Sequence, residues 1–285
     1  APGANKKPHE SVQEALQSFY PQLKLSTVTV ETIDGANLNS SNFKVGSYYV
    51  KLLENKPGSE LVLEFPKLTE RLQNADLPCA SFIENNKGQL VSKTHTHWIY
   101  VQPYIQGSFF RGTKPEFTSM LMALNRLEMA FEKTTSVPSQ AEPYKSFNPI
   151  SLLPKIFMAA QLKKDAWASN LDSNKANLSS LVAFYESTKP NLNFAELSHY
   201  DLHPHNVLLR DDRLVAILDL ESVRLVPKEI SLGFNLFKLA RKCVASKNMS
   251  VSEAAALIEE HFDLEALFII GRIEILRRIL TILKL

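Results

Sequence analysis

The sequence predicts an α+β protein of two lobes, in which a small N-terminal antiparallel β lobe precedes a larger, mainly helical C-terminal lobe. β-Branched residues are concentrated in short runs in the first third of the 285-residue chain. After Gly107 the apolar residues recur at helical spacing. Within the helical half, residues 206–219 contain two apolar runs around Asp211 and Asp212, which is typical of a hairpin. We place the two lobes at residues 1–102 and 103–285.

The strands expected in the first lobe are rich in β-branched or aromatic residues and comprise residues 25–33, 48–53, 81–83 and 98–102. The first two should form a hairpin, because the turn formers of residues 34–42 and a tight turn at Gly46 lie between them. Residues 60–72 predict a helix with Pro66 near its first turn. Residues 103–107 are expected to connect the lobes.

The second lobe is expected to contain helices with apolar residues at a spacing of three and four, at residues 117–131, 152–162, 178–185 and 232–244. Residues 252–285 predict two more helices, divided near Phe262.

Composition excludes several classes of function. Apolar residues make up 45% and charged residues 22%, as in ordinary globular proteins. A net charge of +2 gives no general attraction to nucleic acid or to an anionic membrane. Cys79 and Cys243 are expected to be buried free thiols, with a single disulfide as the alternative. The N-terminal residues lack the apolar core of a signal peptide, and the apolar run at 266–271 is far shorter than the roughly 20 residues of a membrane span. We therefore expect a cytoplasmic monomer or homodimer.

The residues that flank the expected hairpin carry the chemistry. Asp201 and Asn206 are five residues apart across a proline-containing loop, and Asp219 follows the second strand. This order brings two carboxylates and an amide oxygen to one end of a hairpin. Phosphoryl transfer needs such a set, because one carboxylate accepts a hydroxyl proton and hard oxygen atoms bind Mg²⁺. We assign Asp201 as the base and Asn206 and Asp219 as the metal ligands.

The string from His199 to Leu209, followed by Asp219 and Glu221, resembles the protein-kinase-like fold, and within it the aminoglycoside phosphotransferase and choline kinase family. The resemblance covers roughly residues 25 to 240. It implies an enzyme that uses ATP and Mg²⁺ to phosphorylate a hydroxyl group. His199 is expected to brace the catalytic loop. Where the family often has an aspartate in a following helix, this chain has Asn235.

Lys51 lies in the middle of an apolar strand, a position that an ammonium group occupies at a cost unless it has a task. In the resembled fold such a lysine holds the α- and β-phosphates and pairs with a helix glutamate, for which Glu64 is the expected partner and Glu60 the alternative. The loop that covers the phosphates has a single glycine here, so the expected contacts come from Gly35, Ser40, Ser41 and Asn42. Gln102 and Tyr104 are expected beside the adenine.

The segment after Asp219 passes almost directly into a helix and lacks the anchor of protein kinases. This favours a small acceptor: an amino alcohol, a sugar, a homoserine-like compound or an aminoglycoside. The resemblance to choline kinases slightly favours an amine, for which the acidic candidates are Glu221, Glu259, Glu260 and Glu265. The alternatives are a kinase-like nucleotide-binding scaffold without turnover and an atypical protein kinase. A zinc site at the histidines 199, 203 and 205 is disfavoured, because the usual ligand spacings are missing.

Overall fold

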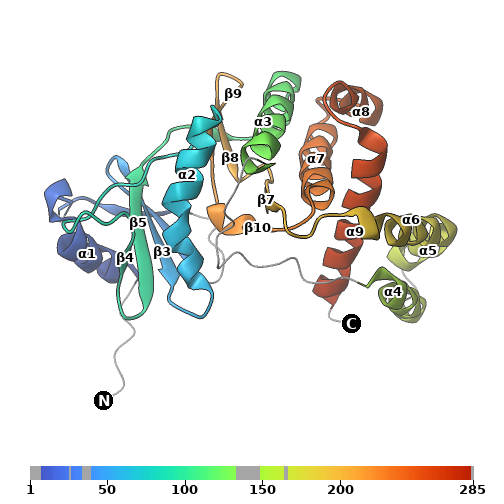
Figure 1. Cartoon of the computed structure of the whole chain (residues 1–285), viewed down its shortest axis with the longest axis horizontal. Coiled ribbons are helices and arrows are strands. Elements are labelled where there is room, and N and C mark those ends of the chain that lie inside the picture. The colour runs from blue at the N-terminus through green and yellow to red at the C-terminus, as the bar shows by residue number, and fades with distance from the viewer. Residues whose placement is uncertain (1–7, 26, 34–39, 133–147, 164–165, 284–285) are drawn as a thin grey trace, which may run out of the picture. The chain divides into compact units, whose positions relative to one another are not determined.

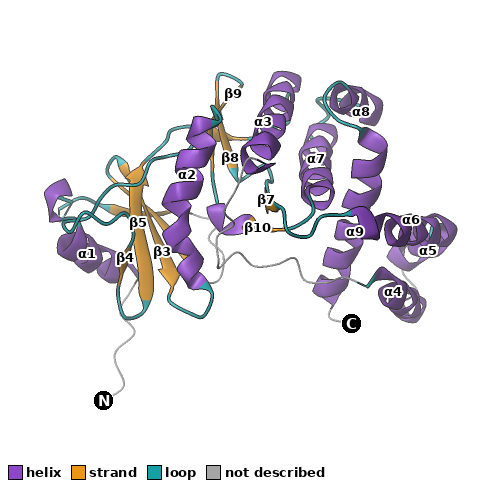
Figure 2. Cartoon of the chain, viewed as in Figure 1, coloured by secondary structure: helices purple, strands orange, loops and turns teal. Residues whose placement is uncertain are grey.

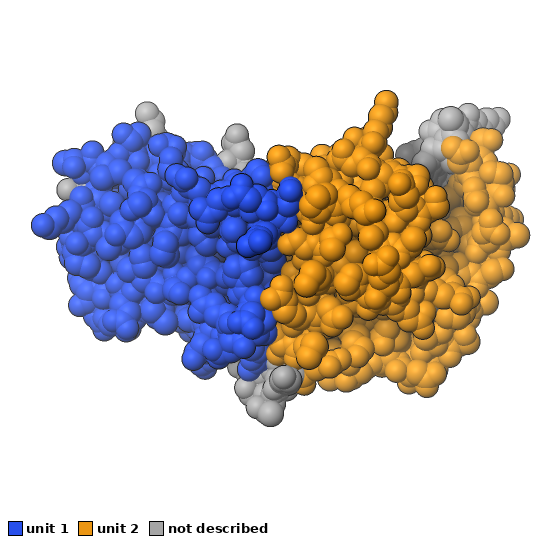
Figure 3. All heavy atoms as spheres, turned by 90° about the horizontal axis from the view of Figure 1, so that it is seen from above, with its two compact units in different colours: residues 1–108, 138–140, 208–221 blue, residues 109–137, 141–207, 222–285 orange. Residues whose placement is uncertain are grey.

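The computed structural model describes residues 8–25, 27–33, 40–132, 148–163 and 166–283 (Figure 1). These residues form two compact units, which Figure 3 distinguishes by colour. Unit 1 holds the described residues up to 108 together with 208–221, and unit 2 holds those of 109–207 and 222–283.

Unit 1 is built on a five-stranded antiparallel sheet of order β1-β2-β3-β5-β4. Its strands are β1 (Val30–Ile33), β2 (Ser40–Val45), β3 (Tyr48–Glu54), β4 (Ser92–Lys93) and β5 (His97–Pro103). The tight turn between β2 and β3 contains Gly46 at a φ of 60°, a left-handed conformation that glycine adopts without strain. The pairing predicted between residues 25–33 and 48–53 is wrong, because β2 lies between β1 and β3 and pairs with both, whereas the predicted tight turn at Gly46 is present between β2 and β3.

Each face of this sheet is covered by a helix, as Figure 2 shows. Alternation along β3 sends Val50 and Leu52 to one face, where they join a core with Val12 and Leu16 of α1 (Pro8–Phe19). The other face carries Lys51 and its neighbour across the sheet, Tyr100. There Phe65 of α2 (Phe65–Asn74) meets the Tyr100 ring edge-on. Lys51 therefore lies on the face that α2 covers.

Two further expectations for this lobe need correction, and one helix was not predicted. The helix predicted for residues 60–72 is a 3₁₀ helix, η2 (Ser59–Glu64), followed by α2, in whose first turn Pro66 does lie. Residues 81–83 form no strand, because a single backbone bond, from Ile83 N–H to the Val101 oxygen, joins them to β5. The sequence also gave no indication of α1, which precedes a short 3₁₀ turn, η1 (Pro21–Leu23).

The hairpin predicted for residues 206–219 consists of β8 (Val207–Arg210) and β9 (Arg213–Ile217), with β6 (Ser108–Phe109) beside β8. Its turn residues Asp211 and Asp212 both have positive φ, the pattern of a two-residue hairpin turn. Most of this hairpin belongs to unit 1, although the predicted boundary near residue 102 assigns it to the second lobe. The Ile217 N–H donates to the Pro78 oxygen (2.9 Å), and Gly107 leaves room for Leu208, which a Cβ at residue 107 would approach to 3.0 Å.

Unit 2 is mainly helical. Its helices are α3 (Lys114–Glu132), α4 (Pro149–Lys163), α5 (Ala166–Ser173), α6 (Lys175–Thr188), α7 (Lys228–Ala245), α8 (Val251–Glu259) and α9 (Leu264–Leu283), with a short η3 (Lys189–Asn191). Strands β7 (Leu197–His199) and β10 (Val223–Leu225) pair antiparallel, and η4 (Leu220–Ser222) precedes β10. The helices predicted from apolar spacing are all present, including the division of the last segment near Phe262.

Helices α7 and α9 cross at very close range. A Cβ on Gly233 would lie 2.0 Å from the backbone oxygen of Leu267, and one on Gly271 would lie 2.6 Å from the carbonyl carbon of Gly233. Two glycines therefore allow the backbones to touch, which fixes the positions of the polar side chains on the same two helices. The predicted α+β class is confirmed. Cys79 and Cys243 are both free, the first half-buried and the second buried. Among the described residues, no helix is long and apolar enough to cross a membrane.

Candidate functional site

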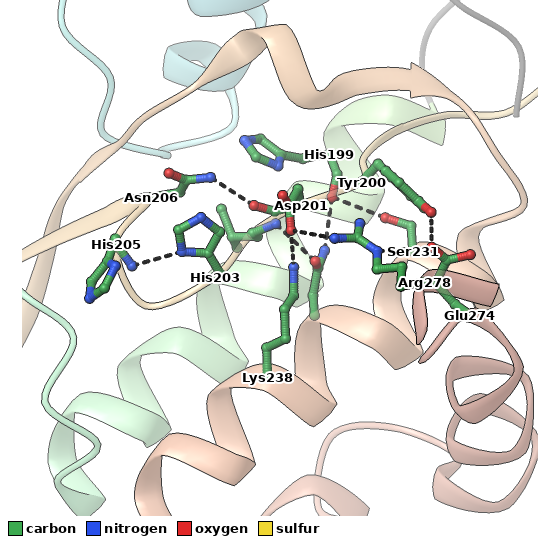
Figure 4. A network of polar contacts seen from close by, with 12 residues as sticks. His199, Tyr200, Asp201, His203, His205, Asn206, Ser231, Lys238, Glu274 and Arg278 are labelled. Atoms are coloured by element: carbon green, nitrogen blue, oxygen red, sulfur yellow. Dashed lines mark hydrogen bonds and ion pairs between the residues drawn. The ribbon is translucent and has the colours of Figure 1, made fainter. Parts of the chain in front are cut away.

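In unit 2, the loop between β7 and β8 presents Asp201 (Figure 4). The loop is closed by its own side chains. The Asn206 amide nitrogen donates to the backbone oxygen of Asp201 (2.8 Å), and its backbone N–H donates to the His203 oxygen (2.8 Å). The His205 N–H donates to the ring Nδ1 of His203 (3.1 Å). These bonds hold Asp201 and Asn206 together, as the sequence predicted.

Helix α7 supports this loop from below. Asn235, which is fully buried, accepts a hydrogen bond from the Leu202 N–H (2.9 Å) and donates one to the His199 oxygen (2.8 Å). The Ser231 hydroxyl donates to the same oxygen (3.0 Å). The backbone is thus held on both sides of Asp201. The amide at residue 235 supplies both a donor and an acceptor, which an ionised aspartate could not do.

The carboxylate of Asp201 is surrounded by positive charge. Its Oδ1 pairs with the Lys238 ammonium of α7 and lies 3.6 Å from Nη1 of Arg278 on α9 (Figure 4). Burial by itself would raise the pKa of Asp201, but Lys238, Arg278 and His203 outweigh it and lower the pKa below its usual value. Asp201 is therefore ionised at neutral pH, although only 29% of its side chain is exposed.

Lys238 and Arg278 were not among the residues predicted from the sequence. Lys238 interrupts an apolar stretch of α7, and this interruption is the same signal that singled out Lys51. Arg278 gives no such signal, because α9 carries charged residues at several positions. Their convergence on Asp201 comes from the packing of α7 against α9.

In unit 1, Lys51 forms a second charged cluster. Lys51 is only 5% exposed, and its ammonium pairs with Glu221 and lies 3.7 Å from Oδ1 of Asp219. Burial favours the neutral amine, but Tyr49, Glu221 and Asp219 outweigh it and raise the pKa of Lys51. Burial also raises the pKa of Glu221 to about 7, against the opposing effect of Lys51. Asp219 follows β9 with a φ of 59°.

The expected partner of Lys51 is wrong. Glu64 pairs with Lys67 (3.3 Å), and Glu60 accepts the Gly58 N–H (3.1 Å). Glu64 is the last residue of η2 and lies directly before α2, so that its side chain reaches Lys67 in the first turn of α2. Glu221, expected to line an acceptor pocket, takes the place beside Lys51 instead. The other three acidic candidates are exposed: Glu259 is the last residue of α8, Glu260 follows it, and Glu265 lies in the first turn of α9.

The remaining expected nucleotide contacts are placed as follows. Gly35 lies outside the described residues. Ser40, Ser41 and Asn42 belong to β2, where Asn42 is the register partner of Lys51 and accepts the Tyr49 hydroxyl (2.8 Å). The Gln102 side chain donates to the Ala80 oxygen (2.7 Å), and the Tyr104 N–H donates to the Ser47 oxygen (2.8 Å). His199 is buried in β7, before Asp201. Their roles with a nucleotide stay predictions.

An antiparallel sheet with a buried lysine, followed by a mainly helical part with an Asp–Asn loop, is the architecture of the kinase-like fold. Solved structures share it over most of the chain. Spectinomycin phosphotransferase in complex with ADP and spectinomycin matches with a TM-score of 0.56 and 16% identity, over 93% of this chain and 98% of that one. Amicoumacin kinase in complex with AMP-PNP, Ca²⁺ and Ami matches with a TM-score of 0.61 and 11% identity, over 93% of this chain and 78% of that one.

An aminoglycoside phosphotransferase from Streptomyces rimosus, APH(3'')-Id, matches with a TM-score of 0.53 and 13% identity, over 92% of this chain and 97% of that one. No family model matches the sequence, and no curated protein matches it. The chain therefore has the fold of the aminoglycoside phosphotransferases over about 93% of its length, and the predicted kinase-like fold is confirmed.

Proposed function

We propose that this protein is an ATP- and Mg²⁺-dependent phosphotransferase that transfers the γ-phosphoryl group to a hydroxyl of a small molecule. The observation that carries the proposal is Lys51, a charged residue in the interior of a sheet, with Glu221 and Asp219 around its ammonium. A fold held together by apolar packing has no need of this cluster, since burying charge costs free energy. The names of its structural neighbours, a phosphotransferase and a kinase of antibiotics, support the same class of reaction.

The residues present fit a nucleotide with its metal ion. Asp219 and Asn206 offer hard oxygen atoms of the type that Mg²⁺ prefers, and Figure 4 shows the Asn206 amide oxygen directed away from the loop that its nitrogen binds. Mg²⁺ would neutralise the charge of the phosphoryl oxygens. Lys51 would bind the phosphates as a positive point charge, in place of one of its present carboxylate partners.

Asp201 is proposed to act on the acceptor. Its carboxylate accepts the hydroxyl proton while the acceptor oxygen bonds to the γ-phosphorus, and the bond from that phosphorus to the bridging oxygen of ADP breaks. The hydrogen bonds of Asn206 and Asn235 keep the loop in place during this step.

The proposal is tested by ATP consumption with Mg²⁺ over a panel of small alcohols, amino alcohols, sugars and aminoglycosides. Asp201→Asn should abolish transfer and leave nucleotide binding intact, whereas Asp219→Asn should abolish the Mg²⁺-dependent rise in melting temperature with ATP. Asp211→Asn is the matched control, because it makes the same substitution at an exposed turn whose left-handed backbone asparagine tolerates.

Three outcomes contradict parts of the proposal. Near-full turnover of Asp201→Asn would show that Asp201 is not the base. Stabilisation by ATP without turnover of any acceptor favours the nucleotide-binding scaffold. The absence of any response to ATP rules out the kinase class altogether.

A further inference from the structure

Positive charge exceeds negative charge around the proposed base. Among the side chains that the structure describes, four cationic groups and two carboxylates are in contact with one another or with the Tyr200 ring: Arg224, Lys238, Arg277 and Arg278, and Asp201 and Glu274. They come from a strand, β10, and from two helices, α7 and α9, and Figure 4 shows Lys238 and Arg278 both directed at Asp201.

Glu274 is already shared between two of these cations. It is almost fully buried and accepts hydrogen bonds from Arg277 (2.8 Å) and from Nε of Arg278 (3.0 Å), as well as from the Tyr200 hydroxyl. One carboxylate thus serves two guanidinium groups. Arg278 also contacts the rings of Phe234 and Tyr200 and lies farther from Asp201.

Arg224 adds a further cation. Its guanidinium lies 4.8 Å from the centre of the Tyr200 ring, and among the described residues its buried Nε has no hydrogen-bond partner. A buried N–H donor without an acceptor costs free energy, which a bound anion or water would recover.

Lys238 is the cation with the most to gain from an anionic ligand. Its side chain is 10% exposed, and its ammonium contacts Asp201 and lies 4.2 Å from the centre of the Phe234 ring. Burial lowers its pKa to about 8, although Asp201 opposes this effect. A cationic acceptor would bring additional positive charge to this place, whereas an anionic acceptor would compensate the charge already there.

We propose that the acceptor of the phosphotransferase is an acidic hydroxyl compound, whose carboxylate or phosphate group is bound by Lys238 and Arg278. This inference rests on the proposed function and departs from the amine-bearing acceptor that the sequence favoured. Arginine and lysine side chains are the usual partners of such anionic groups. The selectivity comes from α7 and α9, the helices that touch at Gly233 and Gly271.

Acceptor binding also prepares the base. Lys238 at present neutralises the carboxylate that has to accept a proton, which makes Asp201 a weak base. When the ammonium turns to the anionic group of the acceptor, the Asp201 carboxylate becomes available to the acceptor hydroxyl. It takes the hydroxyl proton as the oxygen bonds to the γ-phosphorus and ADP leaves, so that Lys238 acts as a specificity and positioning residue.

The experiment compares compounds of related carbon skeleton that carry different charges. One series is D-gluconate, D-glucose, D-glucosamine and D-glucose 6-phosphate, and the other is D-glycerate, glycerol and 3-amino-1,2-propanediol. ATP consumption with Mg²⁺ gives kcat/KM for each compound. We expect the anionic members to exceed the neutral and cationic ones by about 10-fold or more, as a charge-assisted contact implies. The two anions of the hexose series separate a carboxylate from a phosphate site.

Variants of the full chain test the residue. Lys238→Met should reduce the preference for the anionic members by about 10-fold, and Lys238→Arg should retain it, because the charge is kept. Arg241→Met is the matched control, since it removes an exposed positive charge from the same helix and should leave the preference unchanged.

The outcomes separate this inference from the proposed function. Turnover that is faster with D-glucosamine or with 3-amino-1,2-propanediol overturns the anionic acceptor and leaves the phosphotransferase intact. If no compound is phosphorylated, the melting temperature measured with D-gluconate, D-glycerate or D-glucose 6-phosphate tests whether the anion site exists. A rise in the wild type that Lys238→Met lacks supports the anion site without the enzyme, and no rise overturns the inference as well.

Discussion

Replacing Asn235 by alanine should loosen the loop that carries Asp201. Two buried hydrogen bonds disappear: one from the Leu202 N–H and one to the His199 oxygen. Their losses are unequal. The His199 oxygen keeps the hydroxyl of Ser231 as a donor (3.0 Å), whereas Leu202, which is buried, loses the acceptor of its N–H.

The magnitude follows from these two partners. An orphaned buried N–H costs about 1–3 kcal/mol, and a lost bond whose acceptor remains satisfied costs about 0.5–1.5 kcal/mol. Asn235→Ala should therefore lower the free energy of unfolding by about 1.5–4.5 kcal/mol. When Ser231→Ala is combined with Asn235→Ala, the loss of unfolding free energy should exceed the sum of the two single losses, because the His199 oxygen then loses both donors.

Urea unfolding followed by circular dichroism measures the stability, and kcat with an acceptor identified by the proposed ATP-consumption assays measures whether Asp201 is correctly positioned. Asn85→Ala is the matched control. Asn85 is a buried asparagine of unit 1 that accepts the N–H groups of Lys87 (2.8 Å) and Gln89 (3.0 Å). It should lose comparable stability, whereas only Asn235→Ala should also lower kcat beyond the loss of folded protein.

Two results would refute this reasoning. A change in unfolding free energy below about 0.5 kcal/mol for Asn235→Ala would mean that the loop does not depend on the bonds from α7. Equal kcat values for the wild type and for folded Asn235→Ala would mean that these bonds do not position Asp201.

Two further predictions concern unit 2. Burial raises the pKa of Glu128 from 4.5 to about 8, although Ser198 and Lys228 oppose the rise, so the protonated form is favoured in the folded chain. This contribution to stability is fully present below pH 4.5 and is lost as the pH rises through 8. Glu128→Gln should remove up to about 5 kcal/mol of this pH dependence of the unfolding free energy. The prediction is contradicted if the unfolding free energy decreases by the same amount between pH 6 and pH 9 in the wild type and in Glu128→Gln. Gly233→Ala should lower stability by about 3 kcal/mol or more, because its Cβ would lie 2.0 Å from the Leu267 oxygen, and a melting temperature within about 2 °C of the wild type would show that α7 and α9 separate easily.

Local sequence predicted the features that depend on neighbouring residues. The turn at Asp211 and Asp212 follows from two residues that tolerate positive φ between two apolar runs. The loop from Asp201 to Asn206 could be predicted because both partners of its closing bond lie within one short segment. The helices of the second half follow from apolar spacing in the same way.

Lys51 marks the limit of this reasoning. Its place in the middle of a strand predicted a buried, functional ammonium group, and the structure does bury it. Its partner could not be predicted, because Glu64, Glu60 and Glu221 carry the same carboxylate group. Only the folded chain decides which of these carboxylates lies beside the Lys51 ammonium.

The surroundings of Asp201 show the same division. The sequence by itself determined the kinase-like order of elements and the loop that holds Asp201. Only the tertiary structure placed Lys238 and Arg278 beside it, through the contact of α7 with α9 at Gly233 and Gly271. The physical reason is that periodicity determines which face of a helix is buried, whereas the neighbour that a charged side chain meets depends on how closely and at what rotation the helices pack.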